Sequence, residues 1–495
     1  MVAISLPIIS LMVFLPIVAS VFAYLIGRRS DRAVRIFALL ISVVILGLAV
    51  FSYASILISN SGDKMSFEEG PFPWIPTFKG VDYHVGMDGL GAPLVLVSAF
   101  LTVLVVLGSW ELITTRQPLY YTLILLFEGA IIGVFTSLNL LLFYFFWESV
   151  LIPMFFFIGI WGGPRRKYAA MKFFLFTYVA SIIMLLGFLV LYISYAPTFD
   201  LLELEKLSQI TQIPLALQTI VSVATFVGFG VKLPVVPFHT WLPDAHTEAP
   251  APISVFLAGV LLKMGGYGFI RVNLTILHDA SVTYGWIFMA IGLITMFYGA
   301  VVAMTQKDLK RLIALTSVNH MGFVLLGAFT MNVYGVSGAI FQMFNHAAAV
   351  GVLFMLTGYI HEQTGTREIQ LLKGMKVKMP KTATLVILGS MAGMGVPIFS
   401  PFLSEYMVIL GAISVNTGLA VAMLIPVITV GYFLWMLKRT VLSQPDERSL
   451  HYHDMKNFDV VHLTIYLIPL LLLLIFPSLM LNMTNLFAEG LHLVR

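Results

Sequence analysis

Ionisable residues stand in the middle of three apolar stretches of this chain. Lys232 lies in VATFVGFGVKLPVVPFHTWLPDAH, Lys263 in ISVFLAGVLLKMGGYGFIR and Glu148 in LLLFYFFWESVLIPMFFF. An ionised side chain at bilayer depth costs roughly 2.5–3.5 kcal/mol on insertion scales, so such residues are typical of polar pathways through a membrane. The chemistry that these residue types favour is proton transfer between buried acids and bases.

Three further residues, His320, His346 and Glu405, are candidates for the same chemistry. Thr316 lies one helical turn before His320, and Gln342 one turn before His346. A histidine in a helix is often a packing residue, but these polar stripes favour a relay. Glu405 follows a proline-rich break, where it could release protons or cap a half-helix through the helix dipole.

The elements that position these residues are expected to be membrane-spanning helices. Hydrophobic residues make up 59% of the 495 residues and charged ones 11%, well above the apolar share of roughly 45–50% in soluble domains. Cutting at polar or Gly/Pro-rich breaks predicts an all-α polytopic membrane protein with about fourteen spans. They are approximately 4–26, 34–58, 86–109, 119–137, 139–161, 171–194, 216–240, 250–272, 282–304, 311–330, 334–360, 383–410, 418–441 and 461–485.

The charges between the spans predict the orientation. Alternate loops carry the basic residues, namely Arg28, Arg29, Arg32, Arg35, Arg165, Arg166, Lys167, Lys307, Lys310, Arg311, Arg367, Lys373, Lys376, Lys378, Lys438 and Arg439. By the positive-inside rule these loops are cytoplasmic, which places both termini on the outer side. The net charge of +4 follows from these loops, so no nucleic-acid partner is expected.

Two proline-containing segments resemble each other about five spans apart. Lys232-Leu233-Pro234-Val235-Val236-Pro237-Phe238 is loosely repeated as Gly395-Val396-Pro397-Ile398-Phe399-Ser400-Pro401-Phe402. An odd offset reverses the direction of insertion, which predicts two inverted repeats with proline-broken helices. Within a single transmembrane domain, 1–495, we expect a first repeat at 119–272, a second at 282–441 and a C-terminal helix at 461–485.

The two buried lysines have different expected settings. Pro234 removes a backbone donor and disfavours helical geometry at Leu233, so freed carbonyls are expected beside Lys232. Lys263 falls on one stripe with Gly259 and Tyr267, and it could either carry protons or brace a neighbouring helix.

Several kinds of site are not expected in this chain. It has no cysteine, so it cannot supply thiolates to an iron–sulfur cluster, and no nucleotide-binding motif follows a plausible strand. His239, Asp244 and His246 lie close in sequence, but Trp241 and Pro243 indicate a shaped loop, and we expect no metal site. Any redox cofactor should therefore be held by a partner.

Six runs of the chain resemble the antiporter-like subunits of respiratory complex I, and among them the M type (NADH dehydrogenase subunit 4 in mitochondria). They are MDGLGAPLVLVSAFLTVL, FYFFWESVLIPMFF, FGVKLPVVPFHTWLPDAHTEAP, LAGVLLKMGGYGFIR, KDLKRLIALTSVNHMGFV and GVPIFSPFLSE. The resemblance covers nearly the whole chain. It implies fourteen helices in two inverted five-helix repeats, discontinuous helices near Lys232 and Glu405, and proton translocation.

The resemblance also implies residue roles and partners. Glu148 matches the family's essential glutamate, with a buried lysine as its partner, and Glu405 matches the second half-channel. Expected partners are L-type and N-type antiporter-like subunits, small membrane subunits, the lipid bilayer of the cell membrane, and a peripheral arm. That arm would hold flavin and iron–sulfur clusters and pass electrons to a quinone or similar acceptor.

Departures from the family pattern leave the parent complex open. The pattern Gly-Leu-Pro-Gly is here Gly395-Val396-Pro397-Ile398, and His462 stands where many relatives have an acid. These differences favour an archaeal relative, such as the deazaflavin-dependent dehydrogenase of methanogens. Two alternatives are a D-type subunit of a multisubunit sodium/proton antiporter and a membrane subunit of an energy-converting hydrogenase. A membrane-embedded hydrolase or acyltransferase lacks a supporting motif.

Overall fold

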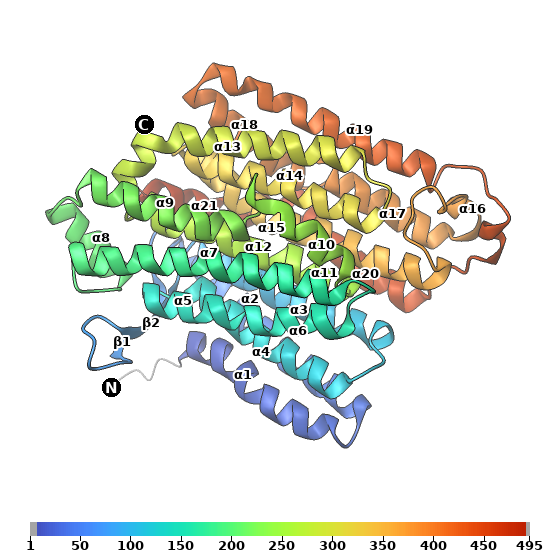
Figure 1. Cartoon of the computed structure of the whole chain (residues 1–495), viewed down its shortest axis with the longest axis horizontal. Coiled ribbons are helices and arrows are strands. Elements are labelled where there is room, and N and C mark those ends of the chain that lie inside the picture. Colours follow the sequence, from blue (N-terminus) through green and yellow to red (C-terminus); the bar gives the residue numbers. More distant parts are fainter. Residues whose placement is uncertain (1–6, 492–495) are drawn as a thin grey trace.

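The computed structural model describes residues 7–491 and is a bundle of nearly parallel helices (Figure 1). The elements are α1 (Ile8–Gly27), α2 (Asp31–Ser59), β1 (Ser66–Pro73), β2 (Asp82–Met87), α3 (Gly91–Leu112), α4 (Gln117–Thr136), α5 (Leu140–Ser149), α6 (Leu151–Trp161), α7 (Arg166–Ser194), α8 (Leu201–Ile210), α9 (Leu215–Lys232), η1 (Phe238–Thr240), α10 (Trp241–Glu248), α11 (Ala251–Phe256), η2 (Leu257–Leu261), α12 (Leu262–Gly268), η3 (Phe269–Leu274), α13 (His278–Met304), α14 (Leu309–Phe329), α15 (Val333–Thr364), α16 (Met375–Lys378), α17 (Pro380–Gly393), α18 (Pro401–Val415), η4 (Thr417–Met423), α19 (Leu424–Arg439), η5 (Arg448–His451), α20 (Asn457–Ile475) and α21 (Ser478–Gly490).

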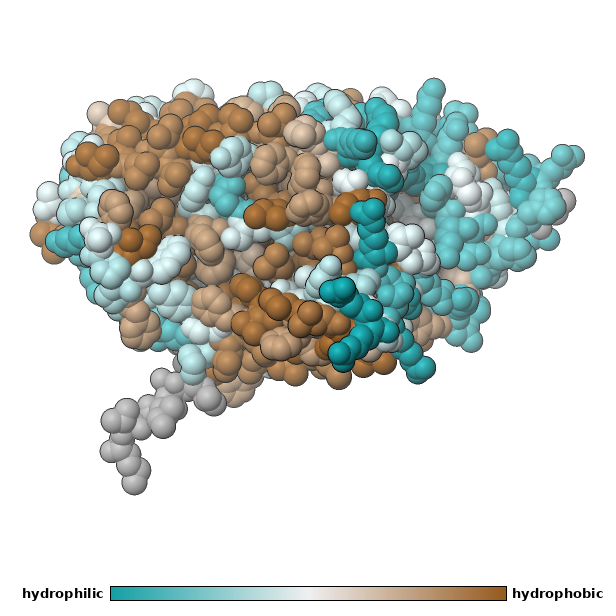
Figure 2. All heavy atoms as spheres, turned by 60° about the horizontal axis from the view of Figure 1, so that its bottom comes forward, coloured by the Kyte–Doolittle hydropathy of each residue, from teal (hydrophilic) through white to brown (hydrophobic). Residues whose placement is uncertain are grey.

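The bundle has the surface of a membrane protein. Within the described residues, thirteen helical segments are long and apolar enough to cross a bilayer. The α18 helix is apolar as well, but it is shorter than these thirteen segments. Figure 2 shows brown, hydrophobic residues across the middle and teal, hydrophilic ones at the right end. The expectation of an all-α polytopic membrane protein is confirmed.

The two ends of the bundle differ in composition. One end, called here the hairpin end, holds β1, β2 and α8 at the left of Figure 1, and α21 lies close to it. The other, called the basic end, holds the loops that carry most of the arginines and lysines, including α16 at the right. The prediction that Lys310 lies in a basic loop is wrong. Lys310 is buried in the first turn of α14 and donates to the Ala249 carbonyl.

Both proline-broken spans are confirmed. The α9 helix ends at Lys232, and helical structure resumes only at η1 and α10. The α17 helix ends at Gly393, and α18 begins at Pro401. In each break two prolines lack the N–H that would continue the helix. A third irregularity follows Glu148, where Pro153 cannot donate to the Ser149 carbonyl and Val150 separates α5 from α6.

Three helical segments form the centre of the bundle and are buried along their whole hydrophobic length. They are α14, α15 and the composite span Ala251–Leu274. That span contains two π-helical segments, η2 and η3, on either side of α12. Each π turn holds one more residue than an α turn, so it shifts the faces of the helix on either side. A Cβ on Gly259 would lie 2.4 Å from the Leu101 side chain of α3 and 3.6 Å from the Ala347 carbonyl oxygen of α15, and Lys263 contacts His346 of α15.

The last predicted helix, 461–485, is wrong as a single element. The α20 helix ends at Ile475, and α21 begins at Ser478. Pro477 lies between them and cannot continue the hydrogen-bond ladder of α20. The α21 helix then covers the hairpin end, where the Tyr53 hydroxyl donates to the Leu479 carbonyl at 2.6 Å.

A β-hairpin at this end was not expected. β1 and β2 pair antiparallel between α2 and α3. His84 of β2 contacts the Asp200 carboxylate through Nδ1 and lies 3.0 Å from Glu68 Oε1 through Nε2. Burial lowers the pKa of His84, but its hydrogen bonds and charge interactions with Asp200 and Glu68 outweigh that effect and raise the pKa above 6.5. The hairpin is thereby anchored to the segment that leads into α8.

Candidate proton relay

The centre of the bundle brings Lys263 of α12 against His346 of α15. Lys263 Nζ lies 2.6 Å from His346 Nδ1 and donates to the Ala258 carbonyl at 2.5 Å. Both residues are almost completely buried. Because an ammonium group can only donate, a charged Lys263 requires a free lone pair on His346 Nδ1. The pair can therefore exchange a proton directly.

Two more candidates extend this contact. The rings of His320 on α14 and His346 are edge to face, with centroids 5.3 Å apart. His320 Nε2 lies 3.5 Å from Glu405 Oε1 on α18. Four of the six candidates, Lys263, His346, His320 and Glu405, thus form one buried cluster, which we call the central cluster. It joins groups whose charge can change by one proton.

A hydrogen-bonded scaffold holds the Glu405 end of the central cluster. Ser404 Oγ donates to Gln342 Oε1 at 2.5 Å and accepts from Asn345 Nδ2 at 3.0 Å. Ser400, in the break before α18, donates to Asn345 Oδ1 at 2.7 Å. The expected polar stripe at Gln342 is therefore used to fix α18 against α15.

The glycine of the second break makes room for Glu405. Gly395 has a φ of +67°, and a Cβ there would lie 2.6 Å from Glu405 Oε2. Glutamate at this position accepts no backbone N–H among the described residues, and the α18 N-cap has no side-chain hydrogen bond. The alternative role as a helix cap is not supported.

The first half is arranged differently. Lys232 is buried, and its Nζ lies over the rings of Trp147, at 5.3 Å from the centroid, and Phe173, at 5.8 Å. Lys232 Nζ has no hydrogen-bond partner among the described residues. Glu148 is close enough for its charge to act on Lys232, yet the two are not paired.

Glu148 lies between the bundle interior and a side cavity. The cavity measures about 610 Å³ and is lined by Glu148 together with aromatic residues that include Tyr144, Phe174 and Tyr178. Glu405 likewise lines a mostly apolar cavity of about 490 Å³ between α18 and α19. Each acid next to a helix break therefore faces open space on one side.

Apolar packing separates Lys232 from the central cluster. The end of α9 contacts α12 so closely that a Cβ on Gly265 would lie 2.5 Å from the Phe229 carbonyl oxygen and 2.7 Å from the Leu233 nitrogen. A Cβ on Gly268 would meet the Phe229 ring at 2.4 Å. The candidates thus form two groups, Glu148 with Lys232 and the central cluster.

His239, Asp244 and His246 do not come together. Asp244 binds Lys172 at 2.7 Å, and the His239 ring packs against Tyr298. His246 is fully buried and stacks on Phe354 with ring centroids 4.5 Å apart. In the described part of the chain no group of three or more potential ligands could hold a metal ion.

Several buried ionisable groups were not predicted to lie near the relay. Neither ring nitrogen of His246 has a hydrogen-bond partner, and the charges of Lys263 and Lys310 both act on this ring. Glu128 accepts from Ser42 at 2.9 Å, and Arg271 binds Asp88 at 2.6 Å. Asp88 and Arg271 stand near the ends of their predicted spans, and His246 stands in a polar run. Glu128 lies in the middle of the predicted span 119–137 and could have been found by the same search as Glu148.

The fold and the central cluster define a class of protein: a multi-pass membrane protein with a chain of buried lysine, histidine and glutamate beside a broken helix. Residues 137–430, more than half of the chain, match the family model described as "NADH:quinone oxidoreductase/Mrp antiporter, TM". The chain belongs to this family.

Individual relatives match over almost the full length. The chain is 37% identical to the "NADH-quinone oxidoreductase subunit M" of Rickettsia felis, covering 98% of this chain and 99% of that protein. It is 36% identical to the "F(420)H(2) dehydrogenase subunit M" of Methanosarcina mazei, covering 97% and 96%. A chain in the structure of "Respiratory complex I from Thermus thermophilus with bound NADH" superposes with a TM-score of 0.86 at 26% identity, covering 98% of this chain and 99% of that chain. These identities do not separate a bacterial from an archaeal parent complex.

Proposed function

We propose that this chain is the M-type, antiporter-like subunit of a complex I-type membrane dehydrogenase and moves protons across the membrane through Glu148, Lys232, Lys263, His346, His320 and Glu405. The observation that carries the proposal is the central cluster. Its ionisable groups are buried in the most enclosed part of the bundle, and structural packing alone does not require four of them side by side. Full-length relatives named as subunit M support the same assignment.

Proton movement begins, in this proposal, at the first break. Glu148 and Lys232 are close without being paired, so a small approach of the carboxylate stabilises the ammonium and a small withdrawal releases its proton. Lifting one charge against ~180 mV costs about 4 kcal/mol. Two unit charges that meet at ~4 Å in a medium of effective dielectric ~20 gain about the same energy. One changing contact is therefore sufficient to drive one proton.

The central cluster then carries the proton towards the second break. Lys263 passes a proton from Nζ to His346 Nδ1, and His346 can release one from Nε2, which has no hydrogen-bond partner. His320 receives it and delivers it to Glu405 Oε1 at 3.5 Å. Each step moves one proton and leaves the donor able to be recharged. Transfer between Lys232 and Lys263 requires water to enter the apolar packing at Gly265.

The coupling ion is a proton in this proposal, and the ligand set supports it. Sodium and other hard cations prefer oxygen ligands. Three of the four groups in the central cluster, Lys263, His346 and His320, offer only nitrogen. A sodium route through this centre is therefore the less favoured function, and the D-type antiporter subunit is an outcome that transport measurements would reveal.

Electron transfer would take place in partner subunits. This chain has no cysteine, so we infer that flavin and iron–sulfur clusters belong to a peripheral arm and that this chain contributes the translocating part of an oxidoreductase complex. L-type and N-type antiporter-like subunits are the proposed membrane neighbours. The relatives' names cover both NADH and reduced F420 as donors, and a quinone-like molecule is the proposed acceptor.

We propose two inverted repeats, 119–272 and 282–441, and an orientation with the basic end in the cytoplasm. The matched proline breaks support the first point and the loop charges the second. Both termini then lie outside the cell membrane. A tag inserted at residue 166 should react only from the cytoplasm, and one after Arg495 only from outside. Reversed labelling would reverse the assigned direction of transport.

The function is tested with the intact complex reconstituted in vesicles. Glu148→Gln should leave assembly intact while strongly reducing proton pumping and coupled turnover, and Glu148→Asp should retain part of both. Glu489→Gln removes an exposed carboxylate of α21 and serves as the control. Normal pumping by the Glu148→Gln complex would remove this residue from the mechanism, and failure to assemble would show a structural role.

A further inference from the structure

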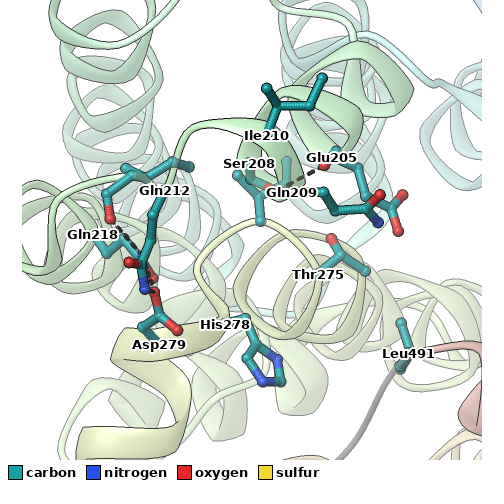
Figure 3. Close-up of a pocket in the computed structure, with 12 residues that line it drawn as sticks. Glu205, Ser208, Gln209, Ile210, Gln212, Gln218, Thr275, His278, Asp279 and Leu491 are labelled. Atoms are coloured by element: carbon teal, nitrogen blue, oxygen red, sulfur yellow. Dashed lines mark hydrogen bonds between the residues drawn. The ribbon is translucent and has the colours of Figure 1, made fainter.

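A polar cleft opens at the hairpin end, which the proposed orientation places outside. It measures about 410 Å³ and is bordered by the hairpin segment, α8, the end of the Ala251–Leu274 span and α21. A second pocket of about 420 Å³ adjoins it and shares Glu205, Gln209 and Thr275 (Figure 3). In that pocket Gln212 and Gln218 both donate to Asp279, at 2.9 and 2.8 Å. The two pockets form a polar, open surface that we call the outer cleft.

Arg271 and Asp88 line the inner wall of the outer cleft. Arg271 is 6% exposed and Asp88 is 2% exposed, so both reach the cleft only by their edges. Arg271 donates to Asp88 Oδ1 at 2.6 Å and to the Tyr267 hydroxyl at 3.2 Å. Asp88 Oδ1 also accepts the N–H groups of Leu90 and Gly91 at the start of α3. Phe487 of α21 covers the guanidinium, 5.5 Å from the ring centroid.

A polar stripe leads from this wall towards the central cluster. Tyr267 lies one helical turn deeper than Arg271, and Lys263 lies one turn deeper again. The Lys263 ammonium points away from Tyr267, towards Ala258 and His346. A proton on the central cluster is thus only two turns from the outer cleft. If the stripe conducted, protons would flow back through it and transport would be short-circuited.

Arginine is unsuited to pass a proton along such a stripe. Its guanidinium has five donors and no acceptor and stays protonated in proteins, so a hydrogen-bonded path cannot continue through it. Its fixed positive charge also raises the energy of a proton or cation nearby, as arginines do in water-selective pores. Asp88 holds the guanidinium in place but faces the cleft, and Tyr267, on the deeper side, is neutral.

We propose that Arg271 is the barrier that keeps the outer cleft and the central cluster electrically separate, so that protons leave only past Glu405. This inference rests on the proposed proton transport. Arg271 is a positioning and blocking residue and takes part in no transfer step. The alternative is that the Arg271–Asp88 pair merely ties α3 to the Ala251–Leu274 span.

Passive proton leak separates the two roles, because it needs no electron donor. The intact complex is reconstituted in vesicles, a pH gradient is applied, and its decay is followed with a pH-sensitive dye. Arg271→Gln should raise the rate of proton leak about tenfold or more. A tenfold increase corresponds to an energy barrier lower by about 1.4 kcal/mol. Arg271→Lys keeps a cation that can lose its proton, so it should leak more than the parent and less than Arg271→Gln. Asp88→Asn keeps the arginine and should stay tight, although it breaks the ion pair.

Folding is controlled by a double variant. Asp88→Asn with Arg271→Gln leaves no unpaired buried charge, so it should assemble, and it should leak as Arg271→Gln does. Lys79→Gln removes an exposed cation at the hairpin end and should change nothing. The proposal is overturned if the assembled double variant is as tight as the parent, or if Asp88→Asn leaks as much as Arg271→Gln. Neither result would touch the pumping test on Glu148, so the two proposals can fail separately.

Discussion

Both broken spans are interrupted by prolines, but the side chains around the two breaks differ. At the first break Lys232 lies against the faces of Trp147 and Phe173 and has no hydrogen-bond partner among the described residues. At the second break Glu405 sits beside Ser404, which hydrogen bonds to Gln342 and Asn345. Proline removes the helical ladder in both places, but aromatic rings line one site and a polar scaffold fixes the other.

Within the proposed transport, we interpret this difference as a division into two physical tasks. A charge held by ring faces and a neighbouring unpaired carboxylate has no strong partner to leave, so its protonation can change at low cost. An acid next to a hydrogen-bonded scaffold keeps its position through each change of charge, because its neighbours are satisfied by one another. We therefore expect the first break to be sensitive to electrostatics and the second to geometry.

The largest expected effect is loss of transport on replacing Glu405. Glu405→Gln should lower net proton transport roughly 100-fold or more, the usual contribution of a positioned proton-transfer group. Glu148 should still titrate in an infrared difference measurement, because the first break stays intact. Since no backbone N–H depends on Glu405, Glu405→Ala should reduce transport to a similar extent. Unimpaired transport in either variant would exclude the release role.

A pair of glycine substitutions sharpens the comparison of the two breaks. Gly265→Ala places a Cβ against fixed backbone of Phe229 and Leu233 at 2.5 and 2.7 Å, so it should destabilise the complex by about 1–3 kcal/mol or more. Gly395→Ala meets a carboxylate that can turn away, but at a positive φ, which costs roughly 1–2 kcal/mol.

Thermal unfolding and transport are measured for both glycine variants. Gly265→Ala should lose more stability than Gly395→Ala. Gly395→Ala should lose more transport relative to its loss of stability, because it displaces Glu405. Gly431→Ala is the control, since nothing lies within 4 Å of its added Cβ. Equal stability losses at positions 265, 395 and 431 would show that neither break is tightly packed.

Removal of one hydroxyl tests the polar scaffold. Ser404→Ala leaves Gln342 and Asn345 each short of a buried partner, which should cost about 1–3 kcal/mol. Trp147→Phe removes an indole N–H that has no partner among the described residues and should cost less in unfolding, while weakening the ring contact of Lys232. If thermal unfolding showed Trp147→Phe to be more destabilising than Ser404→Ala, the proposed difference between the two breaks would be contradicted.

The smallest expected effect lies outside the membrane, at His84. Its pKa is raised by Asp200 and Glu68 despite burial, so its stabilising contribution is complete below the ordinary value of 6.5 and is lost as pH rises through the raised pKa. Amide hydrogen exchange of the β1–β2 hairpin, corrected for the intrinsic pH dependence of exchange, should therefore show less protection at pH values above the raised pKa of His84. His84→Gln should remove this pH dependence, and an unchanged profile in the variant would exclude His84 as its source.

Local sequence patterns predicted the burial of Glu148, Lys232 and Lys263 and the positions of both proline breaks. Pro234 and Pro401 act on their own neighbours, so their effects can be deduced without the fold. The contact between Lys263 and His346 joins residues 83 positions apart, and only the packing of α12 on α15 creates it. The π turns beside Lys263 and the burial of Lys310 were missed for the same reason. Hydropathy also extended the last span beyond Pro477, because α21 is apolar on one face.

The late position of α21 has a consequence for biosynthesis. Met483 lies so close to the loops at Gly62 and Gly89 that a Cβ on either glycine would stand 2.4 Å from its carbonyl oxygen, and the Tyr53 hydroxyl is capped by Leu479. The first two helices can enter the membrane as soon as they are made, yet their contacts at this end are completed only by residues translated more than 400 positions later. A chain that is truncated before α21 would therefore lack the contacts that cover Tyr53, Gly62 and Gly89 at the hairpin end. Quality-control proteases could recognise this uncovered surface.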